Sequence, residues 1–241
     1  MRAPLSALFL AATIAFPAAA HDFVVKPKAA SGASIPVQVM LTEVFIVGDF
    51  VPPIENVTAR VVSGGGASAV ALTANAETKS LEGTAAAPSD APFLVTAKLS
   101  RTRTPRPEAG RPPEPATLSE NASKALLNLK PGATGFDIAT GDRLEIVPLA
   151  NPAELKVGDE LPVKLLFDGK PFAGRILATY DGFSTREATY AYASAAEKDG
   201  LGYVKITAPG LWVVKTSHSL AETAPTYGRY SANANMVFTV R

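Results

Sequence analysis

Two histidines, His21 and His218, offer the clearest chemistry in this chain of 241 residues. Imidazole is the commonest nitrogen ligand for metal ions in proteins. Cysteine is absent, which excludes thiolate sites such as structural zinc and iron–sulfur centres. A metal site built from this sequence would therefore use nitrogen and oxygen donors, or the few methionines.

The first twenty residues predict an export signal that ends just before His21. Arg2 precedes an apolar run from Leu5 to Phe16, and Pro17 leads into a run of three alanines. These are the charged, apolar and small-residue regions of a secretory signal. The apolar run is too short for a stable membrane span, and no later stretch is long enough. We therefore expect a signal peptide at residues 1–20, a periplasmic protein without a direct membrane span, and a mature N-terminus at His21.

An N-terminal histidine supplies two nitrogen donors, because its α-amine and its ring Nδ1 can close a chelate on one ion. A free α-amine has a pKa of about 7.7–8.0, so its proton is displaced readily near neutral pH. The imidazole of His218 would add a third nitrogen, a set that suits nickel, cobalt or copper and, less distinctively, zinc. Asp22 and Glu222 lie close to the histidines in sequence and are candidate oxygen ligands, although such carboxylates are more often simply solvated. The predicted metal residues are His21, His218, Asp22 and Glu222.

Each histidine also has an ordinary explanation when taken singly. Signal peptidase tolerates almost any residue after the cut, and a lone histidine at a strand end commonly bonds to backbone. The sequence contains no Gly-x-Ser-x-Gly nucleophile elbow, no His-Glu-x-x-His motif and no phosphate-binding loop. We therefore expect no catalytic residues, no organic cofactor site and no enzymatic activity.

The elements that position these residues are predicted to be short β-strands. Residues 21–100 hold apolar segments interrupted by turns such as Gly64-Gly65-Gly66, a pattern typical of an immunoglobulin-like sandwich. From about Arg143 onward, strand-like segments recur roughly every ten residues between turns such as Asp181-Gly182. We predict an all-β fold with two immunoglobulin-like or prealbumin-like β-sandwich domains in tandem, at residues 21–100 and 143–241.

The intervening segment, residues 101–142, has a different composition. Five prolines and four arginines between Arg101 and Pro115 predict an exposed loop or linker rather than a strand or helix. Residues 117–129 place four apolar side chains at helical spacing behind a candidate N-cap, Ser119, which predicts a short helix. The alternative is that a strand begins at Ala125, because short apolar runs do not distinguish the two.

The charge balance excludes two classes of partner. The chain has 23 basic and 22 acidic residues, and removal of the signal with Arg2 leaves these numbers equal. Nucleic acids and anionic membrane surfaces require clustered positive charge. We therefore expect no nucleic-acid partner.

Several blocks of the sequence occur in an order that carries a family resemblance. They are His21-Asp22-Phe23, Ser123–Leu127, Leu144–Pro152 with Leu155, Gly158-Asp159 and Leu161–Val163, then Gly169-Lys170-Pro171, Ala173-Gly174, Asp199-Gly200, Gly210-Leu211-Trp212 and His218. In this order they resemble a periplasmic family first catalogued as a domain of unknown function. That family is associated with nickel and cobalt uptake and includes accessory components of energy-coupling-factor metal transporters.

The resemblance implies paired β-sandwich domains and a protein that binds or delivers a transition metal. His21 and His218 fall at positions that match the family pattern. We therefore expect a nickel or cobalt ion as ligand, with copper as a further candidate, and a membrane metal transporter as a partner. The expected function is a periplasmic metal-binding protein that assists uptake through an N-terminal histidine chelate.

Two alternatives stay open at this point. A copper ion held by an N-terminal histidine brace supports oxidative cleavage of polysaccharides, but such enzymes usually present a flat aromatic face and aromatic residues make up only 7% of this chain. A non-metal envelope scaffold or carbohydrate-binding module would leave both histidines incidental, since β-sandwiches host many roles.

Overall fold

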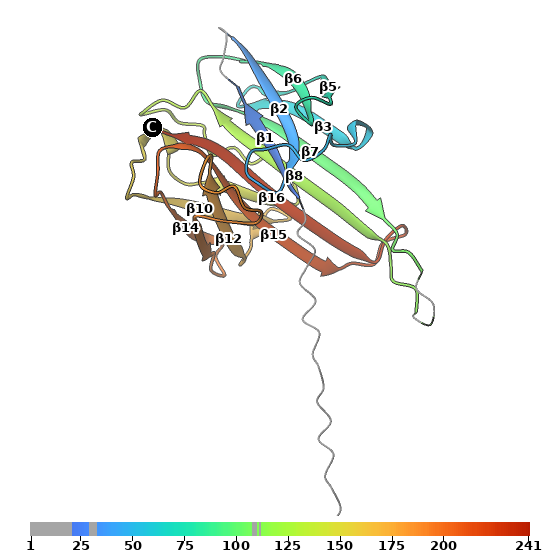
Figure 1. Ribbon diagram of the computed structural model, residues 1–241. Coiled ribbons are helices and arrows are strands. Elements are labelled where there is room, and N and C mark those ends of the chain that lie inside the picture. Colours follow the sequence, from blue (N-terminus) through green and yellow to red (C-terminus); the bar gives the residue numbers. More distant parts are fainter. Residues whose placement is uncertain (1–20, 29–32, 108–109, 111) are drawn as a thin grey trace, which may run out of the picture.

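The computed structural model describes residues 21–28, 33–107, 110 and 112–241 (Figure 1). The predicted signal peptide, residues 1–20, lies outside the described residues. Strands make up the regular structure of the described part, together with two single-turn 3-10 helices, η1 (Ile54–Asn56) and η2 (Pro152–Glu154). The predicted all-β fold class is confirmed.

The strands form three sheets. The N-terminal sheet has the order β1 (Asp22–Pro27), β2 (Ser34–Thr42), β6 (Ser80–Ala86) and β5 (Leu72–Asn75). The central sheet has the order β13 (Tyr192–Ala195), β12 (Arg175–Tyr180), β15 (Gly210–Ala221), β16 (Arg229–Val240), β8 (Thr117–Leu127), β7 (Phe93–Arg103), β3 (Val57–Ser63) and β4 (Gly66–Ala69). The C-terminal sheet contains β11 (Lys170–Pro171), β10 (Glu160–Phe167) and β14 (Leu201–Lys205), with β9 (Leu144–Pro148) also paired to β10.

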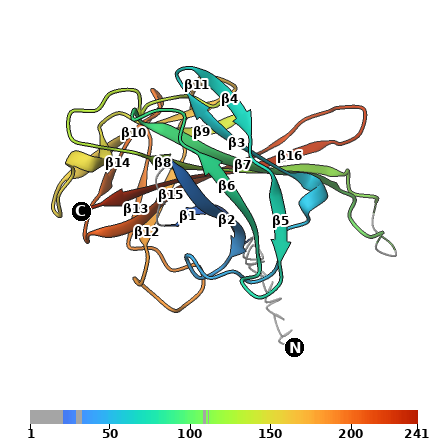
Figure 2. The same cartoon turned by 90° about the horizontal axis from the view of Figure 1, so that it is seen from above.

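Two hydrophobic cores lie on opposite faces of the central sheet. Val95 and Val213 point into the first core, beneath the N-terminal sheet, whereas their neighbours Leu94 and Val214 point into the second, beneath the C-terminal sheet. Such alternation follows from the two-residue repeat of a β-strand. Figures 1 and 2 show the long strands of the central sheet running between the two smaller sheets. The molecule is therefore two β-sandwiches that share one sheet.

The predicted linker at residues 101–142 is only in part a linker. Residues 101–103 complete β7, and residues 117–127 form β8. The two strands pair antiparallel along their whole length, from Phe93 opposite Leu127 to Arg103 opposite Thr117. The domain boundaries expected at 100 and 143 thus cut through a sheet that both sandwiches use.

The helix expected at 117–129 is wrong, because residues 117–127 form strand β8. This strand is covered on both faces, which explains the misleading pattern. Ala125 is buried in the first core and Leu126 in the second. A strand buried on both sides loses the apolar–polar alternation that identifies a half-exposed strand. Its apolar residues then show a spacing that also suits a helix.

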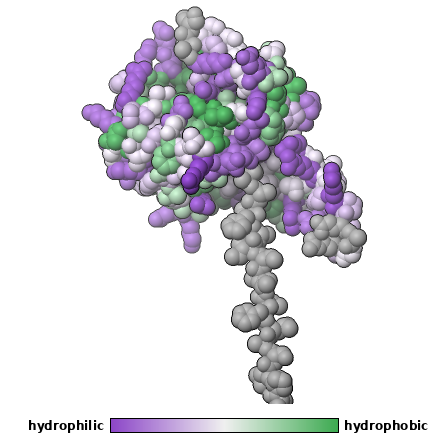
Figure 3. All heavy atoms as spheres, viewed as in Figure 1, coloured by the Kyte–Doolittle hydropathy of each residue, from purple (hydrophilic) through white to green (hydrophobic). Residues whose placement is uncertain are grey.

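The face shown in Figure 3 is mixed, with hydrophobic side chains lying among hydrophilic ones. Within the described ranges, no helix has the length and apolar character needed to cross a bilayer.

Candidate metal centre

The start of β1 lies beside the end of β2. The two strands are antiparallel, with Asp22 opposite Thr42. Continuing this register by one residue puts His21 opposite Glu43, and directly opposed residues in an antiparallel pair have neighbouring side chains on one face. The hairpin of β1 and β2 therefore brings the first described residue next to a carboxylate.

The loop after β2 supplies a second carboxylate by turning back on itself. The backbone N–H of Asp49 donates to the carbonyl of Leu41 (3.0 Å), and Leu41 also forms an isolated bridge with Phe50. The Asp49 carboxylate in turn accepts a hydrogen bond from the backbone N–H of Glu43 (2.6 Å). These contacts hold the loop closed and fix the Asp49 side chain before any ligand arrives.

Gly48 allows this loop to approach its neighbour. A Cβ atom at position 48 would lie 2.8 Å from the carbonyl oxygens of both Thr78 and Lys79. Any side chain at position 48 would clash with these two oxygens. Both belong to the backbone, so they cannot turn aside as the end of a flexible side chain could. Gly48 therefore sets the position of Asp49, its neighbour in the chain.

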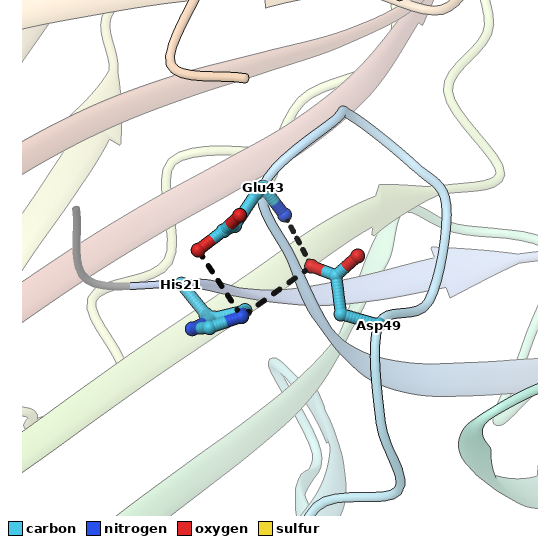
Figure 4. A group of neighbouring side chains, drawn as sticks. All are labelled: His21, Glu43 and Asp49. Carbon is cyan, nitrogen blue, oxygen red and sulfur yellow. Dashed lines mark hydrogen bonds and ion pairs between the residues drawn. The ribbon is translucent and has the colours of Figure 1, made fainter. Parts of the chain in front are cut away.

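His21, Glu43 and Asp49 form a cluster with the spacing of metal ligands (Figure 4). His21 Nε2 lies 3.3 Å from Glu43 Oε1 and 3.6 Å from Asp49 Oδ2. Ligand atoms around one transition-metal ion, each about 2.0–2.2 Å from it, are roughly 3 Å apart. In the part of the chain that the structure describes, this is the one group of three or more His, Cys, Asp or Glu residues whose potential ligand atoms all lie within 4.8 Å of one another.

The cluster is accessible and its imidazole is oriented by an aromatic ring. The three side chains are between 23% and 31% exposed, so an ion can reach them from solvent. The ring of Phe50 packs against His21 with centroids 4.8 Å apart and an interplanar angle of 74°. Nε2 faces the carboxylates in this orientation, and Nδ1 points away from them (Figure 4).

Asp22, predicted as an oxygen ligand, points in another direction. Its carboxylate forms an ion pair with Lys215 Nζ and accepts a hydrogen bond from Tyr190 Oη (3.2 Å). Successive residues of a strand face opposite sides, which is why His21 and Asp22 contact different neighbours. The structure thus places Asp22 beside the cluster but not in it.

His218 lies on the opposite face of the central sheet from Asp22. Lys215 of β15 reaches toward β1, and His218, three residues further along the same strand, points the other way. There its ring packs against Phe167, with centroids 4.7 Å apart, and Phe172, at 4.5 Å. The structure does not bring His21 and His218 together, so one ion cannot use both imidazoles.

Glu222, the other predicted oxygen ligand, belongs to the surroundings of His218. Its carboxylate accepts a hydrogen bond from Arg143 Nη1 (2.9 Å) and another from Tyr227 Oη (3.2 Å). Arg143 also binds Asp168 and lies over the ring of Tyr230, 4.0 Å from its centroid. Burial, and next the positive charge of Arg143, lower the pKa of His218. This neighbourhood disfavours a cation.

Glu43 and Asp49 are the site residues that sequence reasoning missed. Glu43 lies near the end of the strand predicted at Ile35–Val44, Asp49 follows that strand, and both look like ordinary surface carboxylates in sequence. Pairing the two predicted strands nearest the N-terminus as a hairpin would have pointed to Glu43. Asp49 depends on the path of the loop, for which the sequence carries no comparable signal.

Comparisons with known proteins give a family but no activity. A family model described as a domain of unknown function (DUF4198) matches residues 18–220, a range that includes the whole cluster. No curated protein matches the chain. A solved structure described as the D0-D1 domain of Intimin shares 12% identity over 91% of this chain and 98% of that one, with a TM-score of 0.22. At that score the likeness carries no argument.

Proposed function

Because the chain belongs to the DUF4198 family of domains of unknown function, we propose a function from its own geometry: it binds a divalent transition-metal ion through His21, Glu43 and Asp49. The single observation that carries this proposal is the convergence of one imidazole nitrogen and two carboxylate oxygens from separate segments, all within 4.8 Å of one another.

The donor set favours a borderline divalent ion. One imidazole with two carboxylates resembles the ligand types used for zinc, cobalt, nickel and iron, and the two negative charges neutralise a divalent cation. If export processing cleaves before His21, the new α-amine adds a nitrogen at the same place. The chemistry then moves toward nickel, cobalt and copper, which bind nitrogen donors more strongly.

The exposure of the ligands suits a carrier. A structural metal site is usually closed, whereas these side chains are open to solvent on one side, and protein ligands leave part of the coordination shell free. An ion held in this way can be taken up and released. With the export signal predicted at residues 1–20, we propose a periplasmic nickel- or cobalt-binding component of metal uptake, with a membrane transporter as its partner.

The metal centre can take two forms, which differ in the ring nitrogen of His21 that faces the carboxylates. With Nε2 toward the carboxylates, the ion uses Nε2, Glu43 and Asp49, and the α-amine is not required. With the ring turned over, Nδ1 and the α-amine close a chelate on the same side as the carboxylates. Only the second form depends on cleavage before His21.

The test is calorimetric titration of nickel, cobalt and copper into protein that has been exported and cleaved in a bacterial host, with mass spectrometry to confirm a start at His21. A matched protein with one extra N-terminal residue is the control. Binding by both proteins supports the Nε2 form, and binding lost in the control supports the terminal chelate. Absence of binding at micromolar concentrations in both overturns the proposal and favours a non-metal envelope scaffold.

A further inference from the structure

A polar cluster lies immediately behind the proposed metal centre. Asp22 follows His21 in the chain, and its carboxylate contacts Lys215 Nζ and Tyr190 Oη. Lys215 Nζ is also 3.4 Å from Tyr190 Oη. The side chains of Asp22 and Lys215 are only 19% and 14% exposed. Such a cluster costs desolvation energy, so its placement next to the site calls for an explanation.

The charges in this cluster support one another. Burial lowers the pKa of Lys215, but the neighbouring Asp22 carboxylate and Tyr190 raise it by more. The pKa of Lys215 therefore lies above its ordinary value. Burial, and next Asp22, raise the pKa of Tyr190, which keeps its hydroxyl proton available as a donor. The cluster is therefore a charged pair bridged by a neutral phenol.

Tyr190 belongs to a loop that touches both sides of the metal centre. Residues 181–191 connect β12 to β13. From this loop Tyr190 holds Asp22, next to His21, while the backbone N–H of Ala188 donates to the carbonyl of Glu43 (3.3 Å). One loop thus clamps the two strands whose ends carry the imidazole and a carboxylate ligand.

The first residues of a chain fray unless other contacts hold them. If His21 is the mature N-terminus, the position of its imidazole depends on what fixes the start of β1. The Asp22 cluster does this at the first strand residue, and Asn235 Nδ2 assists by donating to the carbonyl of Phe23 (2.9 Å).

We infer that Asp22, Tyr190 and Lys215 are positioning residues for the metal centre, an inference that rests on the proposed function. They fix His21 opposite Glu43 and Asp49. The alternation of the strand already turns the Asp22 carboxylate away from the coordination shell, and Lys215 holds and neutralises it on the far side of the strand. Groups that orient metal ligands from outside the shell are typically worth about 10- to 100-fold in affinity.

The experiment compares nickel and cobalt binding by the wild-type protein, Tyr190→Phe and Lys215→Met. Tyr190→Phe removes only a hydroxyl, so the fold should survive even if Lys215→Met does not. We expect affinity to fall about 10-fold in Tyr190→Phe and up to about 100-fold in Lys215→Met. We also expect a changed visible absorption spectrum of bound cobalt in Lys215→Met, because loss of the ion pair with Asp22 frees the start of β1 and lets the His21 imidazole shift relative to the two carboxylates.

Lys124→Met is the matched control. Lys124 is a buried lysine of the central sheet, paired with Glu145 at 3.6 Å, as Lys215 is paired with Asp22. Its loss should lower the melting temperature and leave metal affinity and the cobalt spectrum unchanged. Wild-type affinity and spectrum in Tyr190→Phe, or an equal affinity loss in Lys124→Met, would overturn the positioning role. A wild-type protein that binds no metal would instead overturn the proposed function.

Discussion

The two histidines share one kind of aromatic contact but lie in different electrostatic surroundings. His21 meets Phe50 edge-on at 4.8 Å and 74°, and His218 meets Phe167 at 4.7 Å and 72°. Beyond the ring, His21 faces two carboxylates, whereas His218 has the guanidinium of Arg143 nearby. The aromatic contact orients an imidazole in both cases, but the charge of the remaining neighbours decides whether a cation is attracted.

The largest expected difference between the two regions is in metal affinity. His21→Gln removes the only nitrogen side-chain ligand of the cluster. We expect the affinity for nickel and cobalt to fall by more than about 100-fold, which exceeds the effect of groups that only orient a ligand. His218→Gln should bind as the wild type does. Parallel calorimetric titrations of the two variants measure this contrast, and a similar loss in both would contradict it.

The second-largest effect is expected at the carboxylates, where a substitution should weaken metal binding without destabilising the metal-free protein. Asp49→Asn keeps an acceptor for the Glu43 N–H but removes one charge, and we expect roughly 10- to 100-fold weaker metal binding. Without metal, the variant should be at least as stable as wild type, because two nearby negative charges no longer repel. Titration and chemical denaturation of the metal-free protein check both parts. A destabilised metal-free variant would indicate a structural carboxylate instead.

The region around His218 should respond in stability rather than in binding. Arg143→Met leaves Asp168 and Glu222 without their shared partner and removes the cation–π contact with Tyr230. We expect the free energy of unfolding to fall by about 1–2 kcal/mol, since these groups are partly exposed. Denaturation of the variant measures this, and its metal affinity, unchanged from wild type, is the internal control.

The smallest effect is a dependence of stability on pH that belongs to His218. Its pKa in the folded protein lies below the ordinary value of 6.5, so below that pH the unfolded chain takes up the proton more readily. The free energy of unfolding should therefore fall as the pH drops below about 6.5 and be unaffected above it. His218→Gln should flatten this part of the profile. Denaturation of metal-free wild type and variant at several pH values gives the difference, and identical profiles would contradict the assignment.

Much of the fold is predictable from sequence because local signals carry it. Turns such as Asp168-Gly169 and Asp199-Gly200 separate the strands of the C-terminal half, where the structure has them. The sharing of the central sheet was not predicted, since no local pattern reveals that β8 and β16 pair. The same lack of pattern in a strand covered on both faces made β8 resemble a helix.

The donor types of the candidate site could be predicted from the sequence, but most of its residues could not. The absence of cysteine and the position of His21 pointed to nitrogen and oxygen donors near the N-terminus. His218 and Glu222 were grouped with His21 because nothing in sequence says on which face of a sheet a residue lies. That information resides in strand register, which fixes Glu43 beside His21 and separates the two histidines.

The parallel pairing of β8 with β16 also governs the order in which the molecule can assemble. Asn121 and Asn233, which face each other across this pair and share a hydrogen bond, are 112 residues apart. During synthesis β8 emerges long before its partner, and both cores close only when the last strand arrives. That strand also carries Asn235, which holds the start of β1. The geometry of the proposed metal centre would thus depend on β16 being in place.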